Sequence, residues 1–155
     1  MTRLATPEDL PVVTTMIREF LLEQHKDGSP VLVSRLSVEF YRDLARSYVT
    51  GSLAGVVALD DTGFAMMGED WGLPRIDSSL GRAAIVWCVW VTPSERRHHR
   101  MLELLRFAEG QLQELGFELG VMHVREANTA GRALSEAFGA TLVERVYHYD
   151  LSKRT

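Results

Sequence analysis

The sequence predicts a single α/β domain in which helices flank a mixed β-sheet. Segments with helical spacing of apolar residues alternate with short runs of strand-forming residues. Ala83–Val91 is almost entirely apolar, as is typical of a central strand that is covered on both faces. The order strand, helix, strand between Ala83 and Val124 predicts a right-handed parallel crossover. The length of 155 residues favours one domain over residues 1–155.

The first part of the chain predicts an edge strand followed by two helices. Met1–Ala5 is short enough for an edge strand. Thr6 and Pro7 mark a helix start, because Thr caps free amides and Pro suits the first helical position. The apolar spacing then continues until Asp27–Pro30, and a second amphipathic helix begins at Ser37.

The remaining segments predict a hairpin followed by the crossover and a last strand. Leu53–Leu59 and Phe64–Met67 pair around the turn Asp60–Gly63, and Gly68–Gly81 forms a loop. The next expected elements are the strand Ala83–Val91, a helix from Met101 to Leu115 and a buried strand Leu119–Val124. A short helix follows, which Asn128 caps and Gly139 ends, and its inward residues are Ala133, Leu134, Ala137 and Phe138. The last expected element is an extended segment Thr141–Leu151.

Composition and charge exclude several classes of protein. Apolar residues make up 46% and charged residues 25%, which is typical of a globular domain. The net charge of −4 disfavours a dedicated nucleic-acid binder. We read neither a membrane-spanning run nor a signal peptide. The one cysteine, Cys88, forms no intramolecular disulfide and belongs to no zinc motif, so we expect a cytoplasmic protein without a metal.

A basic turn follows the central strand and precedes a helix. Arg96, Arg97 and Arg100 lie there together with His98 and His99. Because a helix N-terminus presents free amides and a positive dipole end, this junction suits a diphosphate group. The alternative is a solvated basic turn, since charge runs usually lie on the surface.

The turn resembles the phosphate-binding motif of the GNAT superfamily of acyl-CoA-dependent N-acyltransferases. That motif often reads V-x-P-x-x-R-x-x-G-x-G/A, and Val91, Pro93 and Arg96 match it. His99 and Met101 stand where the family has small residues, which let amides approach the phosphates closely. Either side chains of Arg97, His99 and Arg100 replace the amides, or coenzyme A does not bind.

The resemblance implies a cofactor-binding set and a short helix beside it. The backbone of three strand residues would bind the pantetheine arm beside a splayed strand edge: Val89, Trp90 and Val91. The rest of the set consists of the turn residues and the residue that precedes the short helix: Arg96, Arg97, His98, His99, Arg100, Met101 and Asn128. The segment from Asn128 to Ala140 resembles the family pattern N-x-x-A-x-x-L-Y-x-x-x-G-F. Ser135 stands where the family often has a tyrosine that protonates the departing thiolate. Asn128 is equally explained as a plain N-cap.

The carboxylate that some family members carry early in the central strand is missing, since Ala83, Ala84 and Ile85 stand there. Glu69 and Asp70, just beyond the hairpin, are the candidate bases, although a plain surface position explains acidic residues as well. We expect His123 to be a hydrogen-bonded core histidine rather than a catalyst, and Cys88 to fill space in the strand.

The resemblance implies an enzyme that moves an acetyl group from acetyl-CoA to a primary amine of a small molecule or peptide. The alternative is a catalytically inactive GNAT-fold binding or structural protein, similar to degenerate chains found among phage proteins, that acts through a protein partner. We expect no membrane partner and no nucleic acid. An exposed C-terminal strand edge would allow a homodimer.

Overall fold

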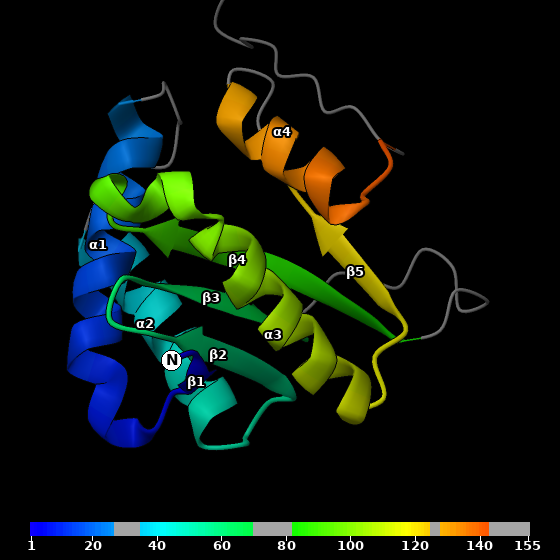
Figure 1. The fold of residues 1–155 in the computed structure, drawn as a ribbon. Coiled ribbons are helices and arrows are strands. Elements are labelled where there is room, and N and C mark those ends of the chain that lie inside the picture. Colours follow the sequence, from blue (N-terminus) through cyan, green and yellow to red (C-terminus); the bar gives the residue numbers. More distant parts are fainter. Residues whose placement is uncertain (27–34, 70–81, 125–127, 143–155) are drawn as a thin grey trace, which may run out of the picture.

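The computed structural model describes residues 1–26, 35–69, 82–124 and 128–142, and its centre is a five-stranded mixed sheet. The strands lie in the order β1–β2–β3–β4–β5 (Figure 1). Their bounds are Arg3–Leu4, Gly55–Leu59, Gly63–Gly68, Ala83–Val91 and Leu119–Met122. The first three pairings are antiparallel, and β5 is parallel to β4. The predicted α/β class with a mixed sheet and flanking helices is therefore confirmed.

Helices cover both faces of this sheet (Figure 1). One core, built around Ile17, Leu44 and Phe64, joins the sheet to α1 (Leu10–Lys26) and α2 (Arg35–Val49). The opposite core, which includes Leu104 and Leu105, joins the sheet to α3 (Arg100–Glu114) and to one side of α4 (Thr129–Phe138). β4 therefore carries apolar side chains on both faces, as its composition predicts.

The N-terminal helix start differs in detail from the prediction. Pro7–Asp9 forms a 3-10 turn, η1, ahead of α1. Thr6 and Asp9 form a capping box: the Thr6 N–H and Oγ1 donate to Asp9 Oδ2, at 2.8 and 3.0 Å, and the Thr6 carbonyl accepts from the Asp9 N–H at 3.0 Å. Arg3 donates to both oxygens of the same carboxylate and so lowers the pKa of Asp9 well below its usual range. The Asp9 carboxylate and Thr6 together organise this turn.

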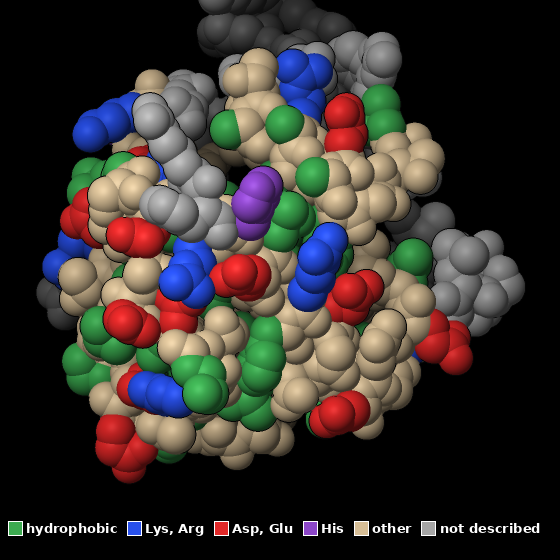
Figure 2. Space-filling model, in the orientation of Figure 1, with side chains coloured by type: hydrophobic (Ala, Val, Ile, Leu, Met, Phe, Trp, Pro, Cys, Tyr) green, Lys and Arg blue, Asp and Glu red, His purple; other side chains and the backbone are tan. Residues whose placement is uncertain are grey.

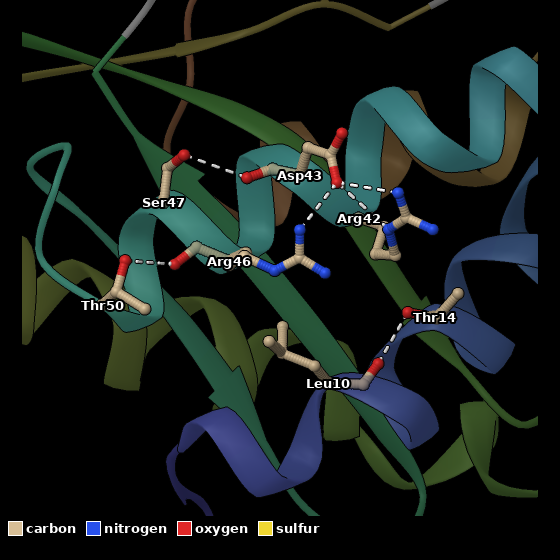
Figure 3. A network of polar contacts seen from close by, with 7 residues as sticks. All are labelled: Leu10, Thr14, Arg42, Asp43, Arg46, Ser47 and Thr50. Atoms are coloured by element: carbon tan, nitrogen blue, oxygen red, sulfur yellow. Dashed lines mark hydrogen bonds and ion pairs between the residues drawn. The ribbon is translucent and has the colours of Figure 1, made fainter.

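The exposed side of α2 is stabilised by local polar contacts (Figure 3). Asp43 Oδ1 accepts from Arg42 and from Arg46, and the Ser47 and Thr50 hydroxyls donate to carbonyls one turn earlier. Pairs as exposed as these contribute little to stability. They satisfy the outer face of the helix and leave the opposite face for the core.

The hairpin and β4 agree with the prediction, and β5 agrees only in part. Asp60 is buried in the hairpin turn, where its Oδ1 accepts from the N–H groups of Thr62 and Gly63. β4 has the predicted bounds. β5 is the expected strand parallel to β4, but the prediction that Leu119–Val124 is buried is wrong: β5 ends at Met122, and Leu119 and Gly120 are exposed. His123, just beyond β5, is also exposed and is not a core histidine. Among the described residues, β5 pairs along one edge only, with β4.

Two further predictions concern the C-terminal part of the chain. Only Leu134 and Phe138 of α4 pack against the core, whereas Ala133 and Ala137 are exposed, so the expectation that all four lie inward is wrong for the alanines. The expected strand from Thr141 to Leu151 lies, beyond Leu142, outside the described residues. Among the described residues, no helix has the length and hydropathy to cross a bilayer.

Candidate functional site

β4 and β5 pair at one end only and then separate (Figure 1). Their register runs from Ala83↔Leu119 to Val86↔Met122, and β4 continues to Val91 without β5 beside it. The separation begins next to a β-bulge: Met67 pairs with Val86 and Met66 with Cys88, so Trp87 is an extra residue on β4. A bulge increases local twist and bends its strand. This leaves the edge of Val89, Trp90 and Val91 unpaired with β5, as the resemblance implies.

The basic turn begins where β4 ends. Thr92 donates twice to the Thr62 carbonyl, from its N–H at 2.7 Å and from its hydroxyl at 2.8 Å, which ties the turn to the β2–β3 hairpin. The 3-10 helix η3 (Pro93–His98) follows, and α3 begins after His99. The turn is therefore fixed at both ends by regular structure.

His99 has a left-handed backbone, with φ 58° and ψ 16°. This is the conformation that favours glycine, and His99 stands at a glycine position of the family motif. Its carbonyl accepts the first α-helical bond, from the Glu103 N–H at 3.1 Å. The amides of the first turn of α3 therefore have no acceptor within the helix. The glycine-type turn is kept here although a side chain occupies it.

The arginines of the turn differ in what they contact. Arg96 Nε donates to the Val91 carbonyl at 2.9 Å, and its Nη2 lies 2.6 Å from Glu23 Oε1 of α1. Arg100 Nη1 pairs with Glu103 at 3.0 Å, while its Nε is buried and has no acceptor among the described residues. Arg96 is therefore tied to α1 and β4, whereas the ion pair of Arg100 lies within the first turn of α3.

The turn fits a phosphate group in part. The first-turn amides of α3 supply donors for an anion, and the Arg100 guanidinium beside them supplies positive charge, although its Nε is buried. Acidic and basic side chains are interspersed on this face, so no large basic patch covers its described part (Figure 2). Arg97 and His98 lie in η3, and their side chains are outside the described set. Met101 is half-buried against the α3 core.

Asn128 and Ser135 both make hydrogen bonds within α4. Asn128 Oδ1 accepts from the Gly131 N–H at 2.8 Å, which is the geometry of an N-cap. A Cβ on Gly131 would lie 2.5 Å from the Asn128 amide nitrogen, so a larger residue there would displace the capping side chain. Ser135 Oγ donates to the Gly131 carbonyl at 2.8 Å. The hydroxyl proton of Ser135 is therefore already used inside the helix.

Glu69 lies at the paired end of β4. Its Oε1 is 3.1 Å from Arg82 Nη2, and both side chains are about one third exposed. Its backbone carbonyl accepts from the Tyr48 hydroxyl at 2.6 Å. Asp70, the other candidate base, lies outside the described residues. The structure thus places Glu69 beside an arginine and on the other end of β4 from the basic turn.

Sequence reasoning missed two residues that organise the site. Glu23 binds Arg96 and also accepts from Trp90 Nε1 at 3.1 Å. Tyr48 accepts from Trp87 Nε1 at 2.9 Å and so links the bulge to α2. Neither residue lies in a motif, and nothing near them in the sequence indicates a role at the site, because their hydrogen-bond partners are distant in sequence. Cys88 fills space as predicted: it is buried, and burial raises the pKa of its thiol well above the usual range.

A cavity of about 270 Å³ lies between the C-terminal half of α3, β5 and the end of α4. It is lined by Val86, Leu112, Met122 and Phe138, among others. It therefore borders the paired half of the β4–β5 ladder rather than the basic turn. In the described part of the chain, no three His, Cys, Asp or Glu side chains are grouped so that they could hold a metal ion.

Comparison with known proteins identifies the fold. No protein-family model matches the sequence, and no curated protein matches it. Among solved structures, a GCN5-related N-acetyltransferase from Ralstonia eutropha JMP134 has a TM-score of 0.71 at 20% identity, with 97% of each chain covered. A putative acetyltransferase from Arthrobacter sp. FB24 has a TM-score of 0.68 at 25% identity, covering 97% of this chain and 94% of that one.

A third similar structure contains a ligand. AAC(6')-Iy, in complex with the bisubstrate analogue CoA-S-monomethyl-acetylneamine, has a TM-score of 0.69 at 17% identity, covering 100% of this chain and 98% of that one. All three similarities extend over nearly the whole of this chain. The chain has the fold of the GNAT acetyltransferases.

Proposed function

We propose that this protein is an N-acetyltransferase that moves an acetyl group from acetyl-CoA to a primary amine. The observation that carries the proposal is the separation of β4 from β5 after Val86, directly ahead of the turn into α3. It provides, in one continuous stretch of chain, a strand edge that no described strand pairs and a set of helix-terminal amides. Similarity to acetyltransferase structures, including one with a CoA-containing ligand, supports this assignment.

The first-turn amides of α3 and Arg100 would bind the diphosphate of acetyl-CoA, with Arg97, His98 and His99 beside them. The edge of Val89, Trp90 and Val91 would hold the pantetheine arm through backbone hydrogen bonds. Arg96 has another role, because Glu23 and the Val91 carbonyl already occupy its guanidinium. It braces the turn against α1.

In the transfer, the amine nitrogen forms a bond to the acetyl carbonyl carbon, and the carbon–sulfur bond breaks. The amine loses one proton, and the departing sulfur gains one. The protein would contribute chiefly by holding the two reactants together and by polarising the carbonyl with strand amides. Glu69 or Asp70 would accept the amine proton, directly or through water. Ser135 does not fit the role of acid, since its proton is bonded to Gly131 O.

A second candidate function is binding without catalysis. It is favoured by the Cβ at His99, which narrows access to the turn amides, and by the pairing of Glu69 with Arg82. On this reading the fold would serve as a surface for a protein partner.

Turnover separates the two functions. Purified protein is incubated with acetyl-CoA and a panel of primary amines; thiol release and the mass of the acetylated product are measured. The buried thiol of Cys88 does not interfere with a thiol reagent while the protein is folded. Transfer that falls in Arg100→Ala but not in Arg106→Ala, an exposed arginine on the same helix, supports the enzyme. Absence of transfer to every amine, together with intact folding, supports the binding protein.

A further inference from the structure

Trp87 lies at the point where the two strands separate. It is the extra residue of the β4 bulge, and it directly follows Val86, the last β4 residue paired with β5. Its side chain packs against the α1–α2 core, on the opposite face of the sheet from α3. A ligand group that approaches the edge of β4 from the face covered by α1 and α2 therefore contacts the residues around Trp87.

Those surroundings are aromatic. Phe40 and Tyr41 of α2 make edge-on contacts with Trp87, at ring-centroid distances of 6.1 and 6.5 Å. Phe40 also contacts Tyr41 at 5.2 Å, and Phe20 of α1 extends the cluster at 6.5 Å from Tyr41. We call these four residues the aromatic wall. Phe40 is 42% exposed, so part of the wall is open to solvent.

The polar atom of Trp87 is already used. Trp87 Nε1 donates to the Tyr48 hydroxyl, which in turn donates to the Glu69 carbonyl. These two bonds fix the indole at the bulge and leave its carbon surface for contact with the other rings. Trp87 therefore contributes apolar and π surface to the wall rather than a hydrogen-bonding group.

Three described carboxylates on this side of the molecule are already paired with arginines. The Glu23 carboxylate is paired with Arg96, and the Glu69 carboxylate with Arg82. Asp43 of α2 is paired with Arg42 and Arg46. A ligand with several ammonium groups would have to compete with these arginines for each carboxylate. A ligand with one amine and an apolar body would not.

We infer that the acceptor is a primary amine carried on an aromatic or bulky apolar group, which packs against Phe40 and Trp87. The inference rests on the proposed function for the transfer itself, and it assigns the acceptor class of that same site. Aromatic contacts of this kind stabilise a complex beyond the area they bury. Selectivity should thus reside in the apolar body of the acceptor rather than in its charge.

The test measures binding and turnover separately. Phenethylamine, butylamine and spermidine are titrated into the full-length protein, with and without desulfo-CoA, and tryptophan fluorescence and heat are recorded. We expect phenethylamine to bind at least about tenfold more tightly than the other two. Phe40→Ala should remove most of that preference. Leu115→Ala, at a similarly exposed position on the far side, should keep it.

The kinetic arm uses the same amines with acetyl-CoA. A higher KM for phenethylamine in Phe40→Ala, with kcat and the KM for acetyl-CoA unchanged, supports the inference. It is overturned if spermidine binds as tightly as phenethylamine, or if Phe40→Ala weakens all three amines equally. If no amine is acetylated but phenethylamine still binds selectively, the proposed function fails while the assignment of the wall stands. If amines are acetylated without aromatic preference, the proposed function stands while the assignment of the wall fails.

Discussion

Arg96 and Glu23 form an ion pair that joins the basic turn to α1, with Arg96 Nη2 at 2.6 and 2.7 Å from the two carboxylate oxygens. Both side chains are about one third exposed. The same carboxylate accepts from Trp90 Nε1, and Arg96 Nε donates to the Val91 carbonyl. The turn, the end of β4 and α1 are therefore held together by one network.

This network should appear as coupling between the two residues. Glu23→Gln and Arg96→Gln, alone and combined, are compared by urea unfolding in a double-mutant cycle. We expect a coupling free energy of about 1 kcal/mol, at the upper end for partly exposed pairs because the contact is short and shared. The cycle for Asp43 and Arg46, whose side chains are 47% and 53% exposed, is the control and should give close to zero. Additive effects of Glu23 and Arg96 would rule out the bracing role.

His99→Gly should stabilise the protein. A side chain in the left-handed region costs about 1 kcal/mol, and glycine avoids that cost. Removal of the Cβ should also allow closer approach to the first-turn amides of α3 and tighten acetyl-CoA binding. Arg106→Gly, in the middle of the same helix, is the control and should destabilise by a similar amount. A loss of stability in His99→Gly as large as in Arg106→Gly would contradict the conformational argument.

Ser135→Ala should leave kcat within about twofold of the parent, because the hydroxyl proton is bonded to the Gly131 carbonyl. The measurement is the steady-state rate with the best amine of the panel. A tenfold or larger fall in kcat at unchanged KM would show that Ser135 supplies a proton after all.

Tyr41 should make stability fall at high pH. Burial raises the pKa of Tyr41 to about 12. In the unfolded chain the phenol ionises near pH 10, so the unfolded state loses its proton first as pH rises. The free energy of unfolding is thus fully retained below about pH 10 and decreases between pH 10 and 12. Thermal unfolding at pH 8 and 11 should show a smaller decrease for Tyr41→Phe than for the parent; equal decreases would be inconsistent with a buried phenol.

The sequence predicts the fold well because its signals are local. The apolar run Ala83–Val91 gives the bounds of β4, and Asn128 and Gly139 give those of α4, because strand composition and helix caps depend on neighbouring residues. The exposure of β5 was not predictable in this way. Burial of a strand depends on what packs over it, and the described part of β5 has a partner on one edge only.

The candidate site is less visible in the sequence. The motif residues Arg96 and Ser135 look available, but their hydrogen bonds go to Glu23 and to the Gly131 carbonyl. The left-handed backbone of His99 follows the family motif, although the residue type argues against it. Contacts such as that of Trp87 with Tyr48 join residues far apart in the chain, and the local patterns of a single sequence do not show which distant residues meet. The catalytic and cofactor-binding roles of all the predicted site residues stay predictions.

The most direct test of the account is a calorimetric titration of the protein with acetyl-CoA, with desulfo-CoA and ATP as comparison ligands. We predict saturable binding of micromolar strength that weakens in Arg100→Ala and is unchanged in Arg106→Ala. Retained binding of desulfo-CoA would show that the diphosphate and pantetheine are recognised without the thioester. No heat and no thermal shift at millimolar acetyl-CoA would contradict the account, because the separated strands and the turn into α3 would then bind no acyl donor.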